Sequence, residues 1–238
     1  MLQMIKDMPP LPLPKKVRIK FSKKGELIYI SHLDLVRTLT RAIIRARIPI
    51  KYTEGYNPIP KMTFATPLSV GCASECEYLD IKIDREITLC KIKEQLSSQV
   101  PEGITILDVY EPNSKFTEAL YSSYNITIRD KSIDEGSASI LNEVFSQNEL
   151  VITKRTKSGE KEVNILPFIK ELKVTSEQGR CDIFTKLCVS SADFLNPEYI
   201  VGVVYSQLKL SKDNFDCQSG YGICRETLYL SDCVSEFR

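Results

Sequence analysis

The sequence lacks the short motifs by which many enzymes and cofactor-binding proteins are recognised. Its 238 residues contain no P-loop, no G-x-G-x-x-G, no G-x-S-x-G and no H-E-x-x-H. His32 is the only histidine, which excludes any metal site built on two histidines. These absences favour a binding protein over an enzyme, and we expect neither a resident metal nor a cofactor.

The eight cysteines are poorly spaced for a metal centre. No C-x-x-C pair occurs, and there is no C-x-x-x-C-x-x-C triplet of the kind that binds an iron–sulfur cluster. Cys72 and Cys76 have no third cysteine nearby, and Cys217, Cys224 and Cys233 are spread over the C-terminal region. We therefore expect reduced thiols that pack as small apolar side chains.

Long apolar runs are also missing. No run approaches the roughly 20 apolar residues that a membrane-spanning helix needs. The first sixteen residues are interrupted by Asp7 and four prolines, which is unlike a secretory signal peptide. We interpret residues 1–16 as a flexible, Pro-rich leader, and we expect a cytoplasmic protein without membrane contacts.

Charge is balanced over the whole chain, at a formal net value of +1, but it is not balanced along it. Residues 15–61 carry twelve Lys and Arg against three Asp and Glu. Residues 62–112 carry four against nine, and residues 113–238 carry fifteen against eighteen. A basic block in an otherwise acidic chain indicates that one surface meets an anionic partner.

The first half of the chain follows the order strand, helix, two strands, helix, strand. Val17, Ile19 and Phe21 alternate with Arg18 and Lys20, which is typical of a half-buried strand whose solvent face is basic. The other expected elements are a helix that starts at Ser31 and is stopped by Pro49, a short strand at 50–53 with extended chain at 61–70, a strand at 76–84, a helix at 88–100 and a strand at 103–111. This is the order of a ferredoxin-like unit.

The second half repeats this order without repeating the sequence. Its expected elements are strands at 121–130, 149–157 and 224–231, a hairpin at 168–190 that turns at Gln178–Gly179, and helices at 135–147 and 196–208. The helix at 196–208 should have Asn196 as its N-cap and Pro197 at its first position. The predicted fold class is therefore α+β, with two tandem ferredoxin-like (βαββαβ) units packed together, at 17–112 and 118–238.

The stretch I-S-H-L-D-L-V-R-T-L-T-R-A-I-I-R-A-R-I-P, residues 30–49, combines a capped helix with a row of positive charge. Ser31 and Asp34 form an S-x-x-D capping box, so the helix should begin at Ser31. Arg37, Arg41 and Arg45 recur every four residues, a spacing at which like charges repel one another. Such a row favours an anionic partner over a plain solvated face.

We expect the basic block to contact phosphate groups of RNA. The candidate nucleic-acid or anion contacts are Arg18, Lys20, Arg37, Arg41, Arg45 and Lys61. Tyr52, Tyr56 and Phe64 lie close to them in sequence and could stack on bases. An acidic protein partner and a plain solvated surface remain open as alternatives.

Several short motifs in residues 17–84 closely resemble the signature of an uncharacterised family of radical-SAM-linked, or radical-SAM-associated, proteins. The motifs are F-S-K-x-G at 21–25, S-H-L-D at 31–34, the Arg-Ala doublets at 41–42 and 45–46, G-Y-N-P-x-P at 55–60, P-L-x-x-G at 67–71 and S-E-x-E-Y-L-D at 74–80. The segment K-R-T-K-S-G-E-K-E-V-N-I-L-P-F-I resembles a second recognisable part of that family.

The resemblance implies a partner and assigns no activity. It implies an accessory protein that acts beside, or fused to, a radical SAM protein. It also suggests that the turn of Gly55, Tyr56, Asn57 and Pro58 is a functional loop rather than a turn alone. We expect a non-catalytic accessory or substrate-binding partner that presents RNA or a ribonucleoprotein through its basic N-terminal surface.

Two other functions remain open at this point. The expected architecture also resembles that of CRISPR repeat-processing endoribonucleases, in which case His32 is the catalytic candidate. The glycine-rich loop of those enzymes is represented only by Gly220 and Gly222. A protein scaffold that does not bind nucleic acid is the third possibility. Glu75 and Glu77 share one face of a strand and are a candidate divalent-ion pair.

Overall fold

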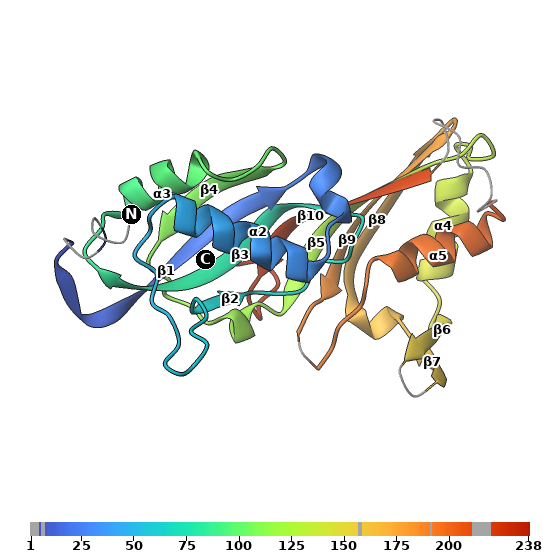
Figure 1. Cartoon of the computed structure of the whole chain (residues 1–238). Helices are drawn as coiled ribbons and strands as arrows, with labels where there is room; N and C mark the ends of the chain where they lie inside the picture. Colours follow the sequence, from blue (N-terminus) through green and yellow to red (C-terminus); the bar gives the residue numbers. More distant parts are fainter. Residues whose placement is uncertain (1–4, 6–7, 157–158, 191, 211–219) are drawn as a thin grey trace. The chain divides into compact units, whose positions relative to one another are not determined.

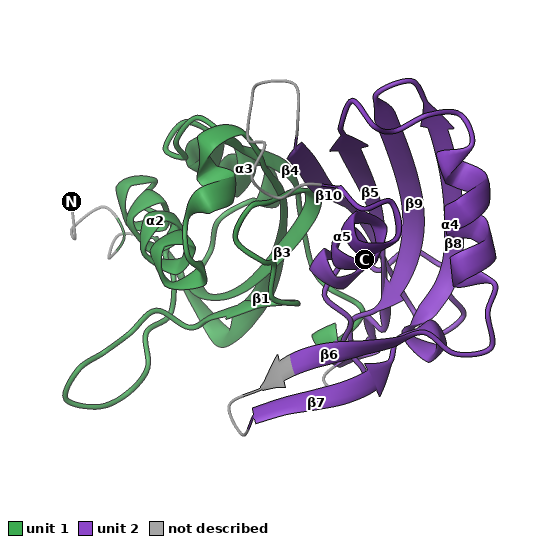
Figure 2. Ribbon diagram, turned by 90° about the vertical axis from the view of Figure 1, so that its right-hand side faces the viewer, with its two compact units in different colours: residues 1–116, 238 green, residues 117–237 purple. Residues whose placement is uncertain are grey.

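The computed structural model describes residues 5, 8–156, 159–190, 192–210 and 220–238. The described residues form a mixed α+β protein with mostly antiparallel β-sheet and four α-helices (Figure 1). The chain divides into two compact units, residues 1–116 with residue 238, and residues 117–237 (Figure 2). They are called unit 1 and unit 2 below, and each is described by itself.

The described part of unit 1 contains four strands and two α-helices. In chain order they are β1 (Pro10–Lys23), the 3₁₀ helix η1 (Gly25–Tyr29), α2 (His32–Arg45), β2 (Met62–Phe64), β3 (Cys72–Arg85), α3 (Leu89–Ser97) and β4 (Ile104–Tyr110). The strands lie in the order β4-β1-β3-β2, and each neighbouring pair is antiparallel. A further 3₁₀ helix, η2 (Phe116–Glu118), spans the boundary between the units.

The core of unit 1 lies between one face of this sheet and the two helices. Val17, Ile19 and Phe21 of β1 are buried there, as their alternation predicts. Helix α2 contributes Leu35, Leu39, Ala42 and Ile43, and α3 contributes Ile92 and Leu96. Both helices therefore cover the same face, and the opposite face carries the alternate residues of the strands.

Two predicted boundaries in unit 1 differ from the observed ones. Strand β1 begins at Pro10, so the later part of the predicted leader is already paired with β3, beginning with Pro10 opposite Arg85. Residues 50–53 form only isolated bridges, Ile50 with Ile83 and Tyr52 with Pro60. Pro49 and the turn at Gly55 leave this segment too short for a regular strand.

Arg18 is the main correction to the sequence prediction. It alternates with core residues and was expected in solvent, yet its side chain is fully buried. Its guanidinium group donates to both carboxylate oxygens of Asp80, at 2.7 and 3.0 Å, because the two residues are directly opposite on β1 and β3. Asp80 is itself only 6% exposed. The guanidinium is therefore neutralised inside unit 1 rather than presented to a ligand.

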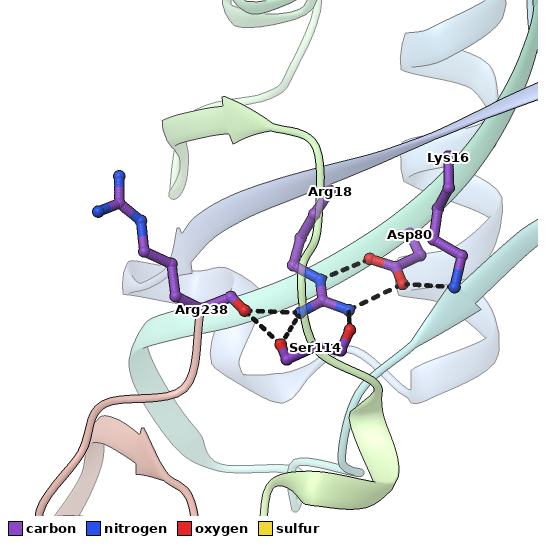
Figure 3. A network of polar contacts seen from close by, with 5 residues as sticks. All are labelled: Lys16, Arg18, Asp80, Ser114 and Arg238. Carbon is purple, nitrogen blue, oxygen red and sulfur yellow. Dashed lines mark hydrogen bonds and ion pairs between the residues drawn. The ribbon is translucent and has the colours of Figure 1, made fainter.

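The remaining donors of Arg18 are satisfied by main-chain and hydroxyl oxygens (Figure 3). They reach Ser114 Oγ at 2.9 Å, the Ser114 carbonyl oxygen at 3.0 Å and the Arg238 carbonyl oxygen at 3.2 Å. Ser114 Oγ also donates to the Arg238 carbonyl oxygen. The Phe116 ring covers the guanidinium plane at 4.4 Å. These contacts exclude water from the Arg18 side chain, although the alternation of residues along β1 alone predicts that this side chain faces solvent.

In unit 2, the residues that the structure describes form six strands and two α-helices. In chain order they are β5 (Tyr121–Arg129), α4 (Ser137–Phe145), β6 (Val151–Thr156), β7 (Gly159–Asn164), η3 (Leu166–Phe168), β8 (Ile169–Glu177), β9 (Arg180–Cys188), α5 (Glu198–Gln207) and β10 (Gly220–Tyr229). The strands β10-β5-β9-β8 are adjacent in this order, and their pairs are antiparallel.

The predicted strand at 149–157 does not join this sheet. Instead, β6 pairs with β7 in a separate two-stranded sheet, from Val151 opposite Asn164 to Thr156 opposite Gly159. Glu160, Lys161 and Glu162 of β7 are all exposed. A strand with consecutive exposed charges has no apolar face to bury in a larger sheet, which explains the separate hairpin.

Of the other predictions for unit 2, the hairpin is confirmed. Strands β8 and β9 form the expected hairpin, and Gly179 at its turn has a φ of +78°, a conformation that favours glycine. The predicted N-cap differs from the observed one, because Pro197 occupies the N-cap position of α5 and Asn196 precedes it. Asn196 Oδ1 accepts a hydrogen bond from the Glu198 main-chain N–H at 3.1 Å. The helix itself begins at Glu198, one residue after the predicted position of Pro197.

The described cysteines are all free thiols. Cys72, Cys76, Cys181 and Cys188 are buried, as expected for small apolar side chains, and burial raises the pKa of Cys181 to about 11. The others differ from this expectation. Cys90 is exposed, and Cys224 and Cys233 are intermediate. Cys217 lies outside the described residues.

No helix in the described part of the chain has both the length and the apolar character needed to cross a membrane.

The substitution Asp80→Asn should lower the free energy of unfolding by about 3–5 kcal/mol, because it leaves the buried Arg18 charge without a counter-charge. Urea unfolding followed by circular dichroism measures the change. Lys173→Met is the control, since it removes an ion pair with Glu171 in which the lysine side chain is 71% exposed. That control should cost less than about 1 kcal/mol. An equal loss from both substitutions would show that Asp80 has no special part in stability.

Candidate functional site

Helix α2 places its arginine residues on the face that does not contact the core. The helix is capped by Ser31, whose Oγ accepts a hydrogen bond from the Asp34 main-chain N–H at 3.2 Å. Its residues Leu35, Leu39 and Ile43 point into the core of unit 1. Arg37, Arg41 and Arg45 are exposed on the other side, at successive turns of the helix.

The three arginines have little acidic compensation. Arg37 Nη1 forms an ion pair with Asp34 Oδ1 at 3.1 Å, and both side chains are more than half exposed. Arg45 Nη2 donates to the Gln99 carbonyl oxygen at 2.8 Å. Among the described residues, the Arg41 side chain takes part in no hydrogen bond or ion pair. A single carboxylate therefore faces three guanidinium groups, and two of the three charges are available to an anionic ligand.

The start of α2 also borders a small pocket, and several of the signature motifs contribute residues to its lining. Its lining residues are Lys23, Ile30, Ser31, His32, Leu35, Phe64, Thr66, Leu68 and Glu77. They come from β1, the start of α2, the chain around β2, and β3. The pocket measures about 10 Å³, which is close to the space that one water molecule needs. It can take a single small polar group but not a nucleotide or a cofactor.

Three ionisable residues meet at this pocket. Lys23 and Glu77 are buried, at 2% and 5% exposure, whereas His32 is exposed at the first position of the helix. The His32 ring meets the Phe64 ring edge to face, with centroids 5.1 Å apart. Within the described chain, His32 forms no hydrogen bond to a carboxylate that could orient it as a general base. Packing against Phe64 is therefore the contact that the structure provides for this histidine.

The turn of Gly55, Tyr56, Asn57 and Pro58 forms the tip of an ordered loop between α2 and β2 (Figure 1). The Thr53 main-chain N–H donates to the Ile59 carbonyl oxygen at 2.8 Å, and Thr53 Oγ1 accepts from the Ile59 N–H at 3.0 Å. Gly55 has a φ of +136°, which only glycine adopts readily. The Tyr56 side chain is fully exposed.

Lysine residues lie at the base of this loop. The Lys61 N–H donates to the Lys51 carbonyl oxygen at 2.9 Å, and the Lys51 N–H donates to the Lys82 carbonyl oxygen at 2.6 Å. Lys16 is directly opposite Lys82 in the β1–β3 register. The sequence analysis singled out Lys61 alone. No local signal relates positions 16, 51, 61 and 82, because strand pairing brings them together.

The structure thus places the six predicted phosphate contacts in four different environments. Arg37, Arg41 and Arg45 share the outer face of α2, whereas Lys61 belongs to the lysines below the loop. Lys20 is half-buried, with Nζ 5.7 Å from the centre of the Tyr78 ring. Arg18 is excluded from surface contacts because it is buried against Asp80.

The other predicted positions lie in different environments in the described residues. Glu75 pairs with Lys24 at 2.5 Å while Glu77 is buried, so the two glutamates have different environments. The described residues contain no group of three or more His, Cys, Asp or Glu able to hold a metal. Gly220 and Gly222 are part of strand β10, and residues 211–219 before them lie outside the described residues.

These features define an α+β protein whose first unit combines a basic helix face, a basic loop base and a small polar pocket. Residues 16–197 match the family described as "Uncharacterized protein conserved in bacteria (DUF2344)", and the chain belongs to that family.

The chain is also similar to a solved structure described as "Crystal Structure of an Unknown Protein from Galdieria sulphuraria". The two are 11% identical, and the similarity covers 92% of this chain and 100% of the other, with a TM-score of 0.27. A similarity of this degree supports no conclusion about fold or function. No curated protein matches the sequence.

The capping contact at the start of α2 gives a pKa prediction. Hydrogen bonds from Ser31 and then from Arg37 lower the pKa of Asp34. The ionised carboxylate is thus favoured, and its capping contribution is lost as pH falls through this lowered pKa. Ser31→Ala should raise the pKa of Asp34 towards its ordinary value, as measured by an NMR titration of the carboxyl carbon. Ser97→Ala, an exposed substitution on α3, should leave it unchanged. A pKa of Asp34 that does not respond to Ser31→Ala would contradict the assignment.

Proposed function

We propose that the protein is a non-catalytic accessory partner of a radical SAM enzyme and that it binds RNA through the basic surface of unit 1. The observation that carries the proposal is the exposed row of Arg37, Arg41 and Arg45, which is faced by the single carboxylate of Asp34. Eight residues of helix separate the first and last arginine, a distance of about 12 Å. A row of this length suits several consecutive phosphates of a nucleic-acid backbone.

Phosphate contacts of this kind position a ligand without reading its sequence. Guanidinium groups are suited to them because they present several donors in a fixed plane. The repulsion between arginines on successive turns costs helix stability in the free protein. Bound phosphates relieve that repulsion, so the row is more favourable in a complex than in isolation.

We infer further that each unit is ferredoxin-like. The inference is supported by the strand orders β4-β1-β3-β2 in unit 1 and β10-β5-β9-β8 in unit 2, each with two helices between its strands. Four-stranded sheets of this kind are common supports for RNA. The architecture is therefore compatible with the proposal but does not by itself assign the function.

The radical SAM partner is supported by the motif resemblance and by the position of those motifs. The motifs at positions 21–25, 31–34 and 74–80 each contribute at least one residue to the lining of the pocket at the start of α2. Nearby, Tyr29 and Leu33 are 70% and 65% exposed, and Val70 is 55% exposed. The Gly71 N–H donates to the Ile28 carbonyl oxygen, which holds Val70 close to Tyr29. Exposed apolar side chains around a polar pocket suit a protein partner.

An endoribonuclease is the second candidate. One observation favours it, namely that His32 shares a pocket with Lys23 and Glu77. A histidine base with a lysine to stabilise developing phosphate charge could cleave RNA without a metal. The small size of the pocket and the lack of an orienting carboxylate bond to His32 count against this role.

A triple Gln substitution of Arg37, Arg41 and Arg45 should weaken RNA binding and make it less dependent on salt. Each lost phosphate contact to a single strand lowers the magnitude of the slope of log K against log salt by about 0.7, so the triple variant should lose roughly 2. Fluorescence anisotropy with a labelled oligouridine measures this between about 50 and 200 mM KCl.

Lys161→Gln provides the matched control, since it removes an exposed charge from β7 of unit 2. It should leave both affinity and slope unchanged. Wild-type affinity that ignores ionic strength would overturn the RNA-binding proposal. Failure of the wild type to bind RNA at all would instead favour the scaffold, in which the arginine row docks on an acidic protein.

A labelled RNA incubated with the protein should remain intact, because the proposed role is non-catalytic. Gel electrophoresis of the products compares the wild type with His32→Ala. Cleavage by the wild type that disappears in His32→Ala would replace the accessory role by the endoribonuclease. Cleavage that persists in His32→Ala would exclude this histidine as its catalyst.

A further inference from the structure

The main chain gathers three lysines that are far apart in sequence at the base of the 53–59 loop. The Lys51 N–H donates to the Lys82 carbonyl oxygen at 2.6 Å. The Lys82 N–H donates to the Lys61 carbonyl oxygen at 3.3 Å, and the Lys61 N–H donates to the Lys51 carbonyl oxygen at 2.9 Å. Each of the three residues is therefore a direct hydrogen-bonding neighbour of the other two.

Lys16 adds a fourth lysine, because it is directly opposite Lys82 on the adjacent strand. Paired strands lie about 4.8 Å apart, so these side chains leave the sheet side by side. All four residues precede or follow a side chain that packs in the core of unit 1. These core neighbours are Val17, Ile50, Met62, Ile81 and Ile83. The lysines thus point away from the core, on the face opposite to α2 and α3.

Acidic residues compensate this cluster only in part. Lys16 Nζ is 3.7 Å from Asp80 Oδ2, but that carboxylate already accepts two hydrogen bonds from Arg18. Lys51 lies 4.0 Å from Glu54, whose side chain is 92% exposed. In the described structure, Lys61 and Lys82 form no ion pair. Like charges directly opposite on paired strands are destabilising, so the cluster has an unfavourable arrangement that an anion would relieve.

The loop that the lysines flank carries an exposed aromatic side chain at its tip. Lys51 and Lys61 stand at the two ends of the loop, and the Thr53–Ile59 hydrogen bonds close it above them. Tyr56 at the tip is 101% exposed. Proteins that hold single-stranded nucleic acid combine cationic side chains, which contact phosphates, with exposed aromatic rings, on which bases stack. The loop offers both, with lysines at its base and a free ring at its tip.

We infer that Lys16, Lys51, Lys61, Lys82 and Tyr56 form a binding site for single-stranded RNA, here called the loop site. The inference rests on the proposed function and names the form of RNA that unit 1 takes. Stacking on Tyr56 needs a base that is free of its own partners, which a duplex does not offer. The loop site is separate from the arginine row, because α2 covers the opposite face of the sheet.

Two sets of variants test the loop site by fluorescence anisotropy with a labelled oligouridine of roughly ten nucleotides. Tyr56→Ala should weaken binding about tenfold, whereas Tyr56→Phe, which keeps the ring, should remain within about twofold of the wild type. The double substitution of Lys61→Gln and Lys82→Gln should reduce the salt slope by about 1.4, for two lost phosphate contacts. Lys91→Gln, on exposed α3 of the same unit, should change nothing.

The form of the RNA is tested with the same oligouridine annealed to its complement. The duplex should bind at least about tenfold more weakly than the single strand, since its bases cannot reach Tyr56. Equal binding of the two forms would overturn the single-strand assignment. Circular dichroism of each variant tests whether unfolding causes a loss of RNA binding. Unfolding of the Tyr56 variants is not expected, because the Tyr56 side chain is fully exposed.

The outcomes separate this inference from the proposed function. Loss of binding in the triple arginine variant, with wild-type affinity in the Tyr56 and lysine variants, would overturn the loop site and leave RNA binding in place. Loss in the loop variants with a normal arginine variant would support the loop site and remove the arginine row from the function. A wild type that binds neither RNA form would overturn both.

Discussion

The buried ion pair between Arg18 and Asp80 determines the geometry on which the basic surface of unit 1 depends. A guanidinium group without water or a counter-charge is very unfavourable, so β1 must pair with β3 in the register that places the two residues opposite each other. A slip of one residue would turn Arg18 into the apolar core and expose Val17 and Ile19. The register that satisfies Arg18 is also the one that sets Lys16 beside Lys82. The same pairing thus neutralises one basic residue and leaves its neighbours charged at the surface.

Unit 1 presents positive charge in two places with different geometry. On α2, the guanidinium groups follow one face of a helix that is capped at Ser31. At the base of the 53–59 loop, ammonium groups come from β1, from β3 and from the two ends of the loop, and the loop carries an exposed aromatic ring at its tip. The helix packs on one face of the sheet and the lysines leave the other, so a short ligand cannot occupy both. The two basic surfaces therefore either have separate roles or bind one RNA that is long enough to pass around the edge of β2.

The signature motifs are explained by the fold in different ways. The glycine and prolines of residues 55–60 shape the loop, and the S-H-L-D motif caps α2 through Ser31 and Asp34. In the S-E-x-E-Y-L-D motif, Asp80 neutralises Arg18, whereas Glu77 lines the pocket with Lys23. Part of the signature therefore preserves the structure of unit 1, and another part borders surfaces that a partner can reach. Membership of the DUF2344 family is consistent with both.

Local sequence determined the features that depend on neighbours along the chain. The capping box marked the start of α2, alternation identified the core residues Val17, Ile19 and Phe21, and Gly179 marked a hairpin, because each of these signals acts within a few residues. The exposed arginine row could likewise be read from its four-residue spacing. Tertiary structure alone decided that Arg18 is buried, since its cover comes from Asp80, Ser114, Phe116 and Arg238, all more than 60 residues away in the chain. It also decided that β6 and β7 stand apart from the main strands and that four distant lysines meet at one loop, because strand pairing is a long-range choice that no local pattern contains.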